Sequence, residues 1–361
     1  MEESMEKNNF GSGFYQPNVD LRDECTRIPT MAQICGLYSL GVILLLFIGF
    51  RVQKQYLYPG LLVTEFLLVL LPSLALLFIF KYDVKKVLRL NRVSLINLLI
   101  IFLIMVFAIP AVGALNLINL ALIKQVFGRV VVSSVPEAEN TGELIINLLI
   151  VGGSAGICEE IMFRGVLQRG FERLGAKKAI LITALLFGLF HLDFQRLLGT
   201  FLLGALIGYI VHRTNSLFAG MFAHFTNNSI AVVITYISNK LTQTMQKSGL
   251  DSSQTQLDAN EYFSAIFSLP ARTQIVVVFT WFFIFSFCLS ILIGLIIALV
   301  RTTSDRVEKY PARERNTGKK GVLWILPGLV LIILMYITQG FGLMGLSSNW
   351  AIFLYKFMGI G

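Results

Sequence analysis

The sequence predicts an all-α, polytopic bundle of transmembrane helices, and three observations support this fold class. Of the 361 residues, 55% are hydrophobic and only 14% are charged. The mean hydropathy of +0.73 lies far above the range of soluble globular proteins. The apolar runs are long and do not alternate with polar residues, so helices rather than a closed β-barrel are expected to satisfy the backbone in the hydrocarbon core.

The apolar runs give the expected number of spans. A helix needs about 20 apolar residues to cross ~30 Å of hydrocarbon. The runs lie near residues 34–50, 58–80, 95–123, 144–168, 178–192, 197–212, 216–237, 274–300 and 321–339. Eight or nine spans are therefore expected, because some runs are short enough to enter the membrane without crossing it. The run at 95–123 is long enough to tilt or to kink at Pro110.

The same pattern divides the chain into five segments. A polar N-terminal segment (1–33) precedes a first group of transmembrane helices (34–143). A central group of helices (144–237) is followed by a polar loop (238–273) and by C-terminal transmembrane helices (274–361). The central group is set apart because it contains most of the charged and amide side chains that lie inside apolar runs.

The basic residues predict the orientation, because Lys and Arg accumulate in cytoplasmic loops. With the N-terminus inside, the inner segments hold 19 of the 30 Lys and Arg residues. These segments are 1–33, 81–93, 169–177, 213–215 and 301–320. We therefore expect a multi-pass protein of the plasma membrane with a cytoplasmic N-terminus. The net charge of +9 is then explained by loops that face the anionic lipid bilayer, and no nucleic acid partner is expected.

Several ionisable and amide side chains lie inside the predicted spans. Such a residue costs several kcal/mol unless it is paired or faces a wet cavity, so it marks a functional site by default. The clearest cases are Glu159, Glu160, Arg164, His191, His224, Asn227 and Asn228. For Asn227, as for His212 and Asn147, we expect a structural role in hydrogen bonds between helices.

Helix geometry separates the two adjacent glutamates. Neighbouring residues of a helix point ~100° apart, whereas residues four apart lie nearly in line. Glu160 and Arg164 have the spacing at which a carboxylate meets a guanidinium on the same helix. Glu159 faces elsewhere and has no such partner, so it is the better candidate for chemistry.

The depths of the candidates in the membrane also agree. At ~1.5 Å per residue from the expected inner ends, Glu159 lies ~15 Å deep, His191 ~20 Å and His224 ~12 Å. Asn228 lies one turn beyond His224. Three helices are therefore expected to bring a carboxylate, two imidazoles and a carboxamide to one cavity near the middle of the membrane.

This set of groups is suited to hydrolysis of a peptide bond. A carboxylate and an imidazole can activate a water, and a second imidazole and an amide can stabilise the oxyanion. Glu159, His191 and His224 are also able to bind Zn²⁺ with a water as fourth ligand, although the HExxH motif is absent. The spacing leaves both mechanisms open. The competing interpretations are helix packing alone and a proton relay in a transporter.

The three motifs resemble those of the CPBP family of intramembrane proteases. This family includes the type II CAAX prenyl endopeptidases and the Abi proteins of bacteriocin processing or self-immunity, and its pattern is EExxxR, FxxxH and HxxxN or HxxxD on successive helices. Residues 159–164, 187–191 and 224–228 match the three motifs in this order. The resemblance extends over about residues 144–236, so it implies that segment 144–237 is a CPBP/CAAX protease core.

The resemblance implies roles for seven residues: Glu159 and His191 activate the water, His224 and Asn228 form the oxyanion site, Glu160 and Arg164 support Glu159, and Phe187 walls the cavity. The family is widely described as metalloproteases. We prefer a mechanism without a metal cofactor, since Asn228 is a better oxyanion donor than zinc ligand. The expected substrate is a membrane-associated protein or peptide. The alternative is a non-proteolytic membrane scaffold or a bacteriocin self-immunity protein.

Overall fold

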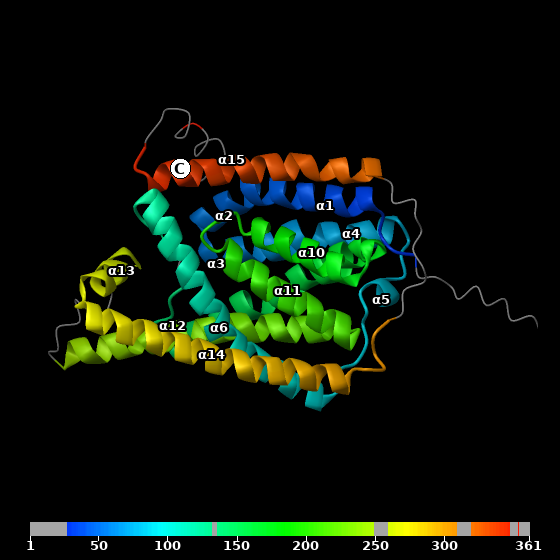
Figure 1. Ribbon diagram of the computed structural model, residues 1–361. Helices are drawn as coiled ribbons and strands as arrows, with labels where there is room; N and C mark the ends of the chain where they lie inside the picture. Colours follow the sequence, from blue (N-terminus) through cyan, green and yellow to red (C-terminus); the bar gives the residue numbers. More distant parts are fainter. Residues whose placement is uncertain (1–26, 132–135, 249–258, 309–318, 347–352, 354–361) are drawn as a thin grey trace, which may run out of the picture.

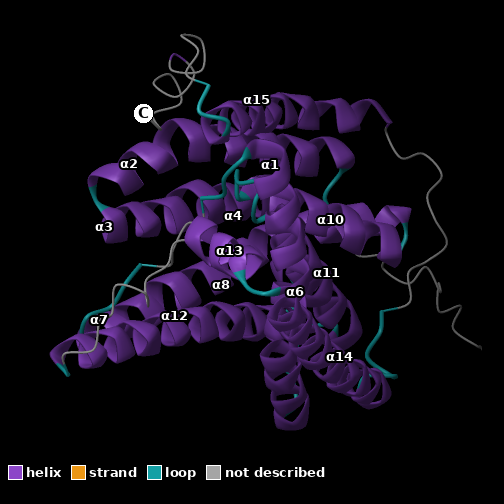
Figure 2. Cartoon of the chain, turned by 60° about the vertical axis from the view of Figure 1, so that its left-hand side comes forward, coloured by secondary structure: helices purple, strands orange, loops and turns teal. Residues whose placement is uncertain are grey.

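The computed structural model describes residues 27–131, 136–248, 259–308, 319–346 and 353. All regular structure in these residues is helical, and no strand occurs among them (Figure 2). Eight of the helical segments described are long and apolar enough to cross a membrane: Met31–Gln55, Leu57–Ile79, Leu95–Phe127, Thr141–Leu174, Leu197–Thr214, Leu217–Lys247, Ala271–Thr302 and Lys320–Leu343. The predicted all-α polytopic bundle is therefore confirmed.

The first three spans come from the N-terminal part of the chain. The first contains α1 (Met31–Leu44), the π-helical turn η1 (Leu45–Gly49) and α2 (Phe50–Gln55). The second contains α3 (Leu57–Leu62), the π-helical segment η2 (Val63–Leu70) and α4 (Leu71–Ile79). The short α5 (Val84–Val87) leads to α6 (Leu95–Phe127), which contains Pro110 and runs obliquely across the bundle (Figure 1).

The fourth span is built from six short helical segments. They are α7 (Thr141–Asn147), the π-helical η3 (Leu148–Ser154), α8 (Ala155–Glu160), the π-helical η4 (Ile161–Gln168), α9 (Arg169–Phe171) and the 3₁₀ turn η5 (Glu172–Leu174). Next follow α10 (Ala176–Phe190), α11 (Leu197–Thr214) and α12 (Leu217–Lys247). π-Helical turns are rare in proteins, but where they occur they often lie at functional sites. Here they flank the two glutamates of α8 on both sides.

The remaining described helices are α13 (Ala259–Ser268), α14 (Ala271–Thr302), the 3₁₀ segment η6 (Lys319–Ile325) and α15 (Leu326–Leu343). Helix α15 packs along α1, and α14 packs along α6 (Figure 1). The segment expected as a polar loop, 238–273, is mainly helical where it is described. Residues 238–247 contain neither Gly nor Pro, so nothing interrupts α12 before Lys247.

The fifth predicted run, 178–192, differs from the others in length. It forms α10, whose 15 residues cover only about 22 Å and which is not among the eight candidate spans. Helices α10 and α11 pack together as a hairpin, and His191 lies in the turn between them. The short helix therefore places an imidazole at its end.

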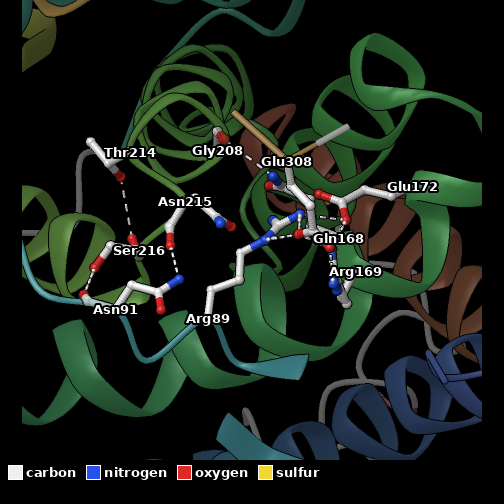
Figure 3. A network of polar contacts seen from close by, with 10 residues as sticks. All are labelled: Arg89, Asn91, Gln168, Arg169, Glu172, Gly208, Thr214, Asn215, Ser216 and Glu308. Atoms are coloured by element: carbon white, nitrogen blue, oxygen red, sulfur yellow. Dashed lines mark hydrogen bonds and ion pairs between the residues drawn. The ribbon is translucent and has the colours of Figure 1, made fainter. Parts of the chain in front are cut away.

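A network of charged side chains, buried except for the partly exposed Glu308, joins three segments at one end of the bundle (Figure 3). Arg89 donates to Glu172 at 2.7 Å, and Arg169 donates to both Glu172 at 3.0 Å and Glu308 at 2.7 Å. Burial alone would raise the pKa of Glu308, but the hydrogen bonds and charges of Arg169 and Arg89 outweigh it and lower this pKa. The described parts of the predicted inner segments 81–93, 169–177 and 301–320 are thus held together at one end.

The largest apolar core lies between α1, η4 and α10. It includes Tyr38, Met162, Phe163 and Phe190, all nearly or fully buried. The hydroxyl of Tyr38 donates to the carbonyl of Leu186 at 3.0 Å, so α1 is fixed to the helix that leads to His191. This packing holds the segment that follows the two glutamates against α10.

Candidate active site

The structure brings the three sequence motifs to one place. Glu159 and Glu160 end α8, His191 caps α10, and His224 lies within α12. Helix α12 packs against η3, α8 and η4, and α10 packs against η4. The side chains of all three motifs therefore meet between these elements.

The carboxylate of Glu160 connects two of the motifs. It accepts from Arg164 Nη1 at 2.6 Å and from His224 Nδ1 at 3.0 Å, and all three side chains are buried. A carboxylate paired with a guanidinium only accepts hydrogen bonds, so Nδ1 of His224 must carry a hydrogen. The sequence predicted the pair with Arg164 but not the bond to His224.

Glu159 faces the other nitrogen of the same imidazole. Its Oε2 lies 3.8 Å from Nε2 of His224, and 15% of its side chain is exposed, whereas Glu160 is fully buried. The two glutamates thus approach His224 from opposite nitrogens. As helix geometry predicted, they point in different directions, and Glu159 is the one that is partly exposed.

Two glycines allow this close approach of the helices. A Cβ on Gly220 would lie 2.7 Å from Oε2 of Glu160 and 2.5 Å from a methyl carbon of Val211. A Cβ on Gly204 would lie 3.1 Å from the ring of Phe187, and the Gly204 carbonyl accepts from Arg164 Nη2 at 3.0 Å. Helices α11 and α12 reach the buried ion pair because these positions have no side chain.

Phe187 lies between the two histidines. Its ring centroid is 4.9 Å from that of His191 and 5.7 Å from that of His224, and both contacts are edge-to-face. The guanidinium carbon of Arg164 lies over the same ring at 4.5 Å. His191 Nδ1 donates to the carbonyl of Phe187 at 2.9 Å, so its Nε2 keeps a free lone pair.

Asn228 is held in one orientation by its neighbours. Its Nδ2 donates to the carbonyl of Val151 at 2.9 Å, and its Oδ1 accepts from Asn227 at 3.0 Å. An amide group has two N–H donors, so one N–H of Asn228 remains for another partner. Asn227 was expected to link helices, and in the structure it orients Asn228 instead.

Some of the expected contacts do not form. In the described part of the chain, no hydrogen bond or ion pair joins Glu159 to His191 or to Asn228. No group of three His, Cys, Asp or Glu side chains among those residues is arranged to hold a metal ion. As arranged, Glu159, His191 and His224 therefore do not fit a zinc site, and we derive no step through a metal.

Glu65 is a further ionisable residue near the site, and the sequence analysis missed it. It lies in η2, the residue is 8% exposed, and its Oε2 is buried without a hydrogen-bond partner among the described residues. The segment η2 packs against α8, which carries Glu159. The criterion that singled out Glu159, a charge inside an apolar run, applies equally to Glu65, but this residue belongs to none of the three motifs.

Comparison with known proteins supports the family indicated by the motifs. Residues 141–230 match the family described as type II CAAX prenyl endopeptidase Rce1-like. Neither the curated proteins nor the solved structures gave a significant match. The matched segment begins with α7 and ends in α12, so it contains the helices that position all three motifs. Residues 141–230 of this multi-pass membrane protein are therefore similar to the type II CAAX prenyl endopeptidases, and this supports the resemblance to the CPBP family.

Proposed function

We propose that this protein is an intramembrane endopeptidase that hydrolyses a peptide bond in a membrane-associated protein or peptide, with Glu159 as the general base. One observation carries the proposal. The carboxylate of Glu159 faces an imidazole, His224, whose other nitrogen is held by a fully buried Glu160–Arg164 pair. Helix packing alone does not require a partly exposed carboxylate to face an imidazole that is held in one orientation.

In this mechanism Glu159 and His191 activate the water. Glu159 accepts a proton from the water, and the free Nε2 of His191 accepts the second hydrogen bond that orients it. Phe187 supports this arrangement, because its carbonyl fixes the tautomer of His191 and its ring separates the two imidazoles. The activated oxygen then attacks the carbonyl carbon of the scissile bond.

His224 and Asn228 stabilise the oxyanion that forms. The Nδ1–H group of His224 already donates to Glu160. The ring can therefore donate from Nε2 only when Nε2 also carries a proton. The carboxylates of Glu159 and Glu160 lie on its two sides, 3.8 Å from Nε2 and 3.0 Å from Nδ1. The remaining N–H of Asn228 supplies a second donor. A charged and a neutral donor, both held in place beforehand, are what oxyanion stabilisation requires.

We further propose that the protein lies in the plasma membrane. The end of the bundle that contains the Arg89–Glu172 pair then faces the cytoplasm. This end holds the described parts of the segments richest in Lys and Arg, and such segments remain on the cytoplasmic side. The substrate then reaches the site laterally or from this end. The partners required are the lipid bilayer and a substrate with a membrane anchor.

The activity is tested with the purified protein in lipid nanodiscs and a quenched-fluorescence peptide that ends in a prenylated Cys-a-a-X sequence. We expect cleavage at one bond, located by mass spectrometry. A folded protein that cleaves neither this peptide nor a panel of lipid-anchored peptides would contradict the proposal.

Asn228→Ala is expected to lower kcat by about 10²-fold, the effect of losing one oxyanion donor. KM should change little, because the donor acts on the charge that develops in the transition state. The matched control is Asn147→Ala, which removes another buried amide that donates to a carbonyl, that of Pro136 at 2.8 Å. Equal kcat losses in the two variants would mean that Asn228 acts only through packing.

Removal of metal ions distinguishes the two mechanisms. We expect wild-type protein to keep its rate after treatment with a strong chelator, with metal removal verified by elemental analysis. This follows from the arrangement of Glu159, His191 and His224, which does not fit a zinc site. Loss of activity with the chelator and recovery with Zn²⁺ would instead establish the metal mechanism.

A further inference from the structure

Glu65 is a buried carboxyl group that the proposed mechanism does not use. It lies inside the second span, ~12 Å from the start of α3 at Leu57 at 1.5 Å per residue. The residue is 8% exposed, and its Oε2 is buried and makes no hydrogen bond within the described structure. An unpartnered carboxyl group inside a span is costly, so a functional reason for it is expected.

Glu65 and the proposed base are neighbours. The π-helical segment η2, which carries Glu65, packs against α8, which carries Glu159. Two carboxyl groups of two different spans therefore lie on segments that pack together at the proposed site.

The charges around the site decide which of these carboxyl groups holds a proton. Glu160 is paired with Arg164, and Glu159 faces His224, which the proposed mechanism requires as a cation. These two pairs are neutral. No cationic side chain in the described part of the chain forms an ion pair with Glu65. A further negative charge beside Glu159 is unfavourable in a medium of low dielectric constant. Glu65 is thus the group that carries the proton.

We propose that Glu65 is the general acid of the reaction and protonates the leaving amine, while Glu159 is the base. This inference rests on the proposed peptidase function. An amide nitrogen leaves only with a proton, and an acid that already holds one and has no competing acceptor is suited to donate it. An acid and a base of the same residue type then differ only in their surroundings.

The proton balance of the step is complete. Glu159 takes a proton from the water while the water oxygen forms a bond to the carbonyl carbon of the scissile bond. Glu65 gives its proton to the nitrogen as the C–N bond breaks, which yields a carboxylic acid and an amine. Glu159 then holds a proton and Glu65 does not, and transfer from Glu159 back to Glu65 restores the starting state. The pair holds one proton before and after the reaction and two while the tetrahedral oxyanion exists, so the total charge of the reacting groups does not change.

The test compares two versions of one substrate. The first is the quenched peptide that the wild type cleaves, and in the second a thioester replaces the scissile amide. A thiol with a pKa of about 8.5 leaves as a thiolate, so its departure needs no acid. We expect Glu65→Gln to lower kcat for the peptide by about 10²- to 10⁴-fold and kcat for the thioester by only a few-fold. Glu159→Gln should lose both activities, because both reactions need the activated water.

The controls separate this role from a structural one. Glu65→Asp keeps an acid with a shorter reach and should recover part of the peptide activity. Glu137→Gln makes the same chemical change on an exposed carboxylate and should leave both rates as in wild type. Equal losses for peptide and thioester in Glu65→Gln, or no loss for the peptide, would overturn the proposal. A wild-type protein that cleaves neither substrate would instead contradict the peptidase function.

Discussion

Glu159→Gln protein is expected to fold like the wild type and to cleave the quenched peptide at least about 10³-fold more slowly, within the range for loss of a general base. The substitution keeps the shape of the side chain and removes only its ability to accept a proton. Glu159 makes no hydrogen bond in the described structure and is partly exposed, so its loss should cost little stability. The measurements are kcat in nanodiscs and the unfolding midpoint of the same preparation.

The control for this variant is Glu137→Gln, on the exposed segment before α7. It should leave kcat and the unfolding midpoint at their wild-type values. Cleavage by Glu159→Gln at the wild-type rate would remove Glu159 from the mechanism. A large fall in its unfolding midpoint would show that the carboxylate supports the fold rather than the reaction.

Arg164→Met should have the largest effect on stability, a loss of about 3–5 kcal/mol in the free energy of unfolding. In the wild type, the Arg164 guanidinium donates to the fully buried Glu160 at 2.6 Å and to the Gly204 carbonyl at 3.0 Å. The variant loses both hydrogen bonds and leaves the Glu160 carboxylate without its guanidinium partner. The measurement is unfolding in mixed detergent micelles. The matched control is Arg196→Met. Arg196 forms a partly exposed ion pair with Asp193 at 3.7 Å, and loss of such a pair lowers the free energy of unfolding by only about 0–1 kcal/mol.

A double variant separates the stability of this ion pair from its role in the reaction. Glu160→Gln combined with Arg164→Met removes both buried charges and should recover most of the lost stability, because an apolar replacement of a buried pair is often neutral. Its kcat should stay at least about 10²-fold low, since a neutral amide in place of the Glu160 carboxylate removes the negative charge that faces Nδ1 of His224. A double variant with wild-type kcat would mean that Glu160 does not orient or charge His224.

The sequence was sufficient to predict the fold class and the pairing on α8. Apolar runs of about 20 residues define spans by themselves. The i, i+4 spacing of Glu160 and Arg164 predicted their ion pair, which the structure contains. The sequence predicted eight or nine spans because the run at 178–192 is short. This run forms a 15-residue helix that ends at the predicted site.

Contacts between helices were beyond the reach of the sequence. Depth estimates place residues along the membrane normal but not around it, so they did not show that Glu160 binds His224 or that Asn227 orients Asn228. Glu65 went unnoticed for a related reason. It lies about 90 residues from the motifs in sequence, and only the packing of η2 against α8 makes it a neighbour of Glu159.

The central claim, that this protein is a peptidase that depends on Glu159, is tested most directly in cells. Protein termini are compared by mass spectrometry in cells that contain the wild type or Glu159→Gln at equal abundance. The account predicts new termini in membrane-associated proteins that are present with the wild type and absent with the variant. Identical termini, together with a phenotype that the variant still rescues, would contradict it and favour a scaffold or a bacteriocin self-immunity protein.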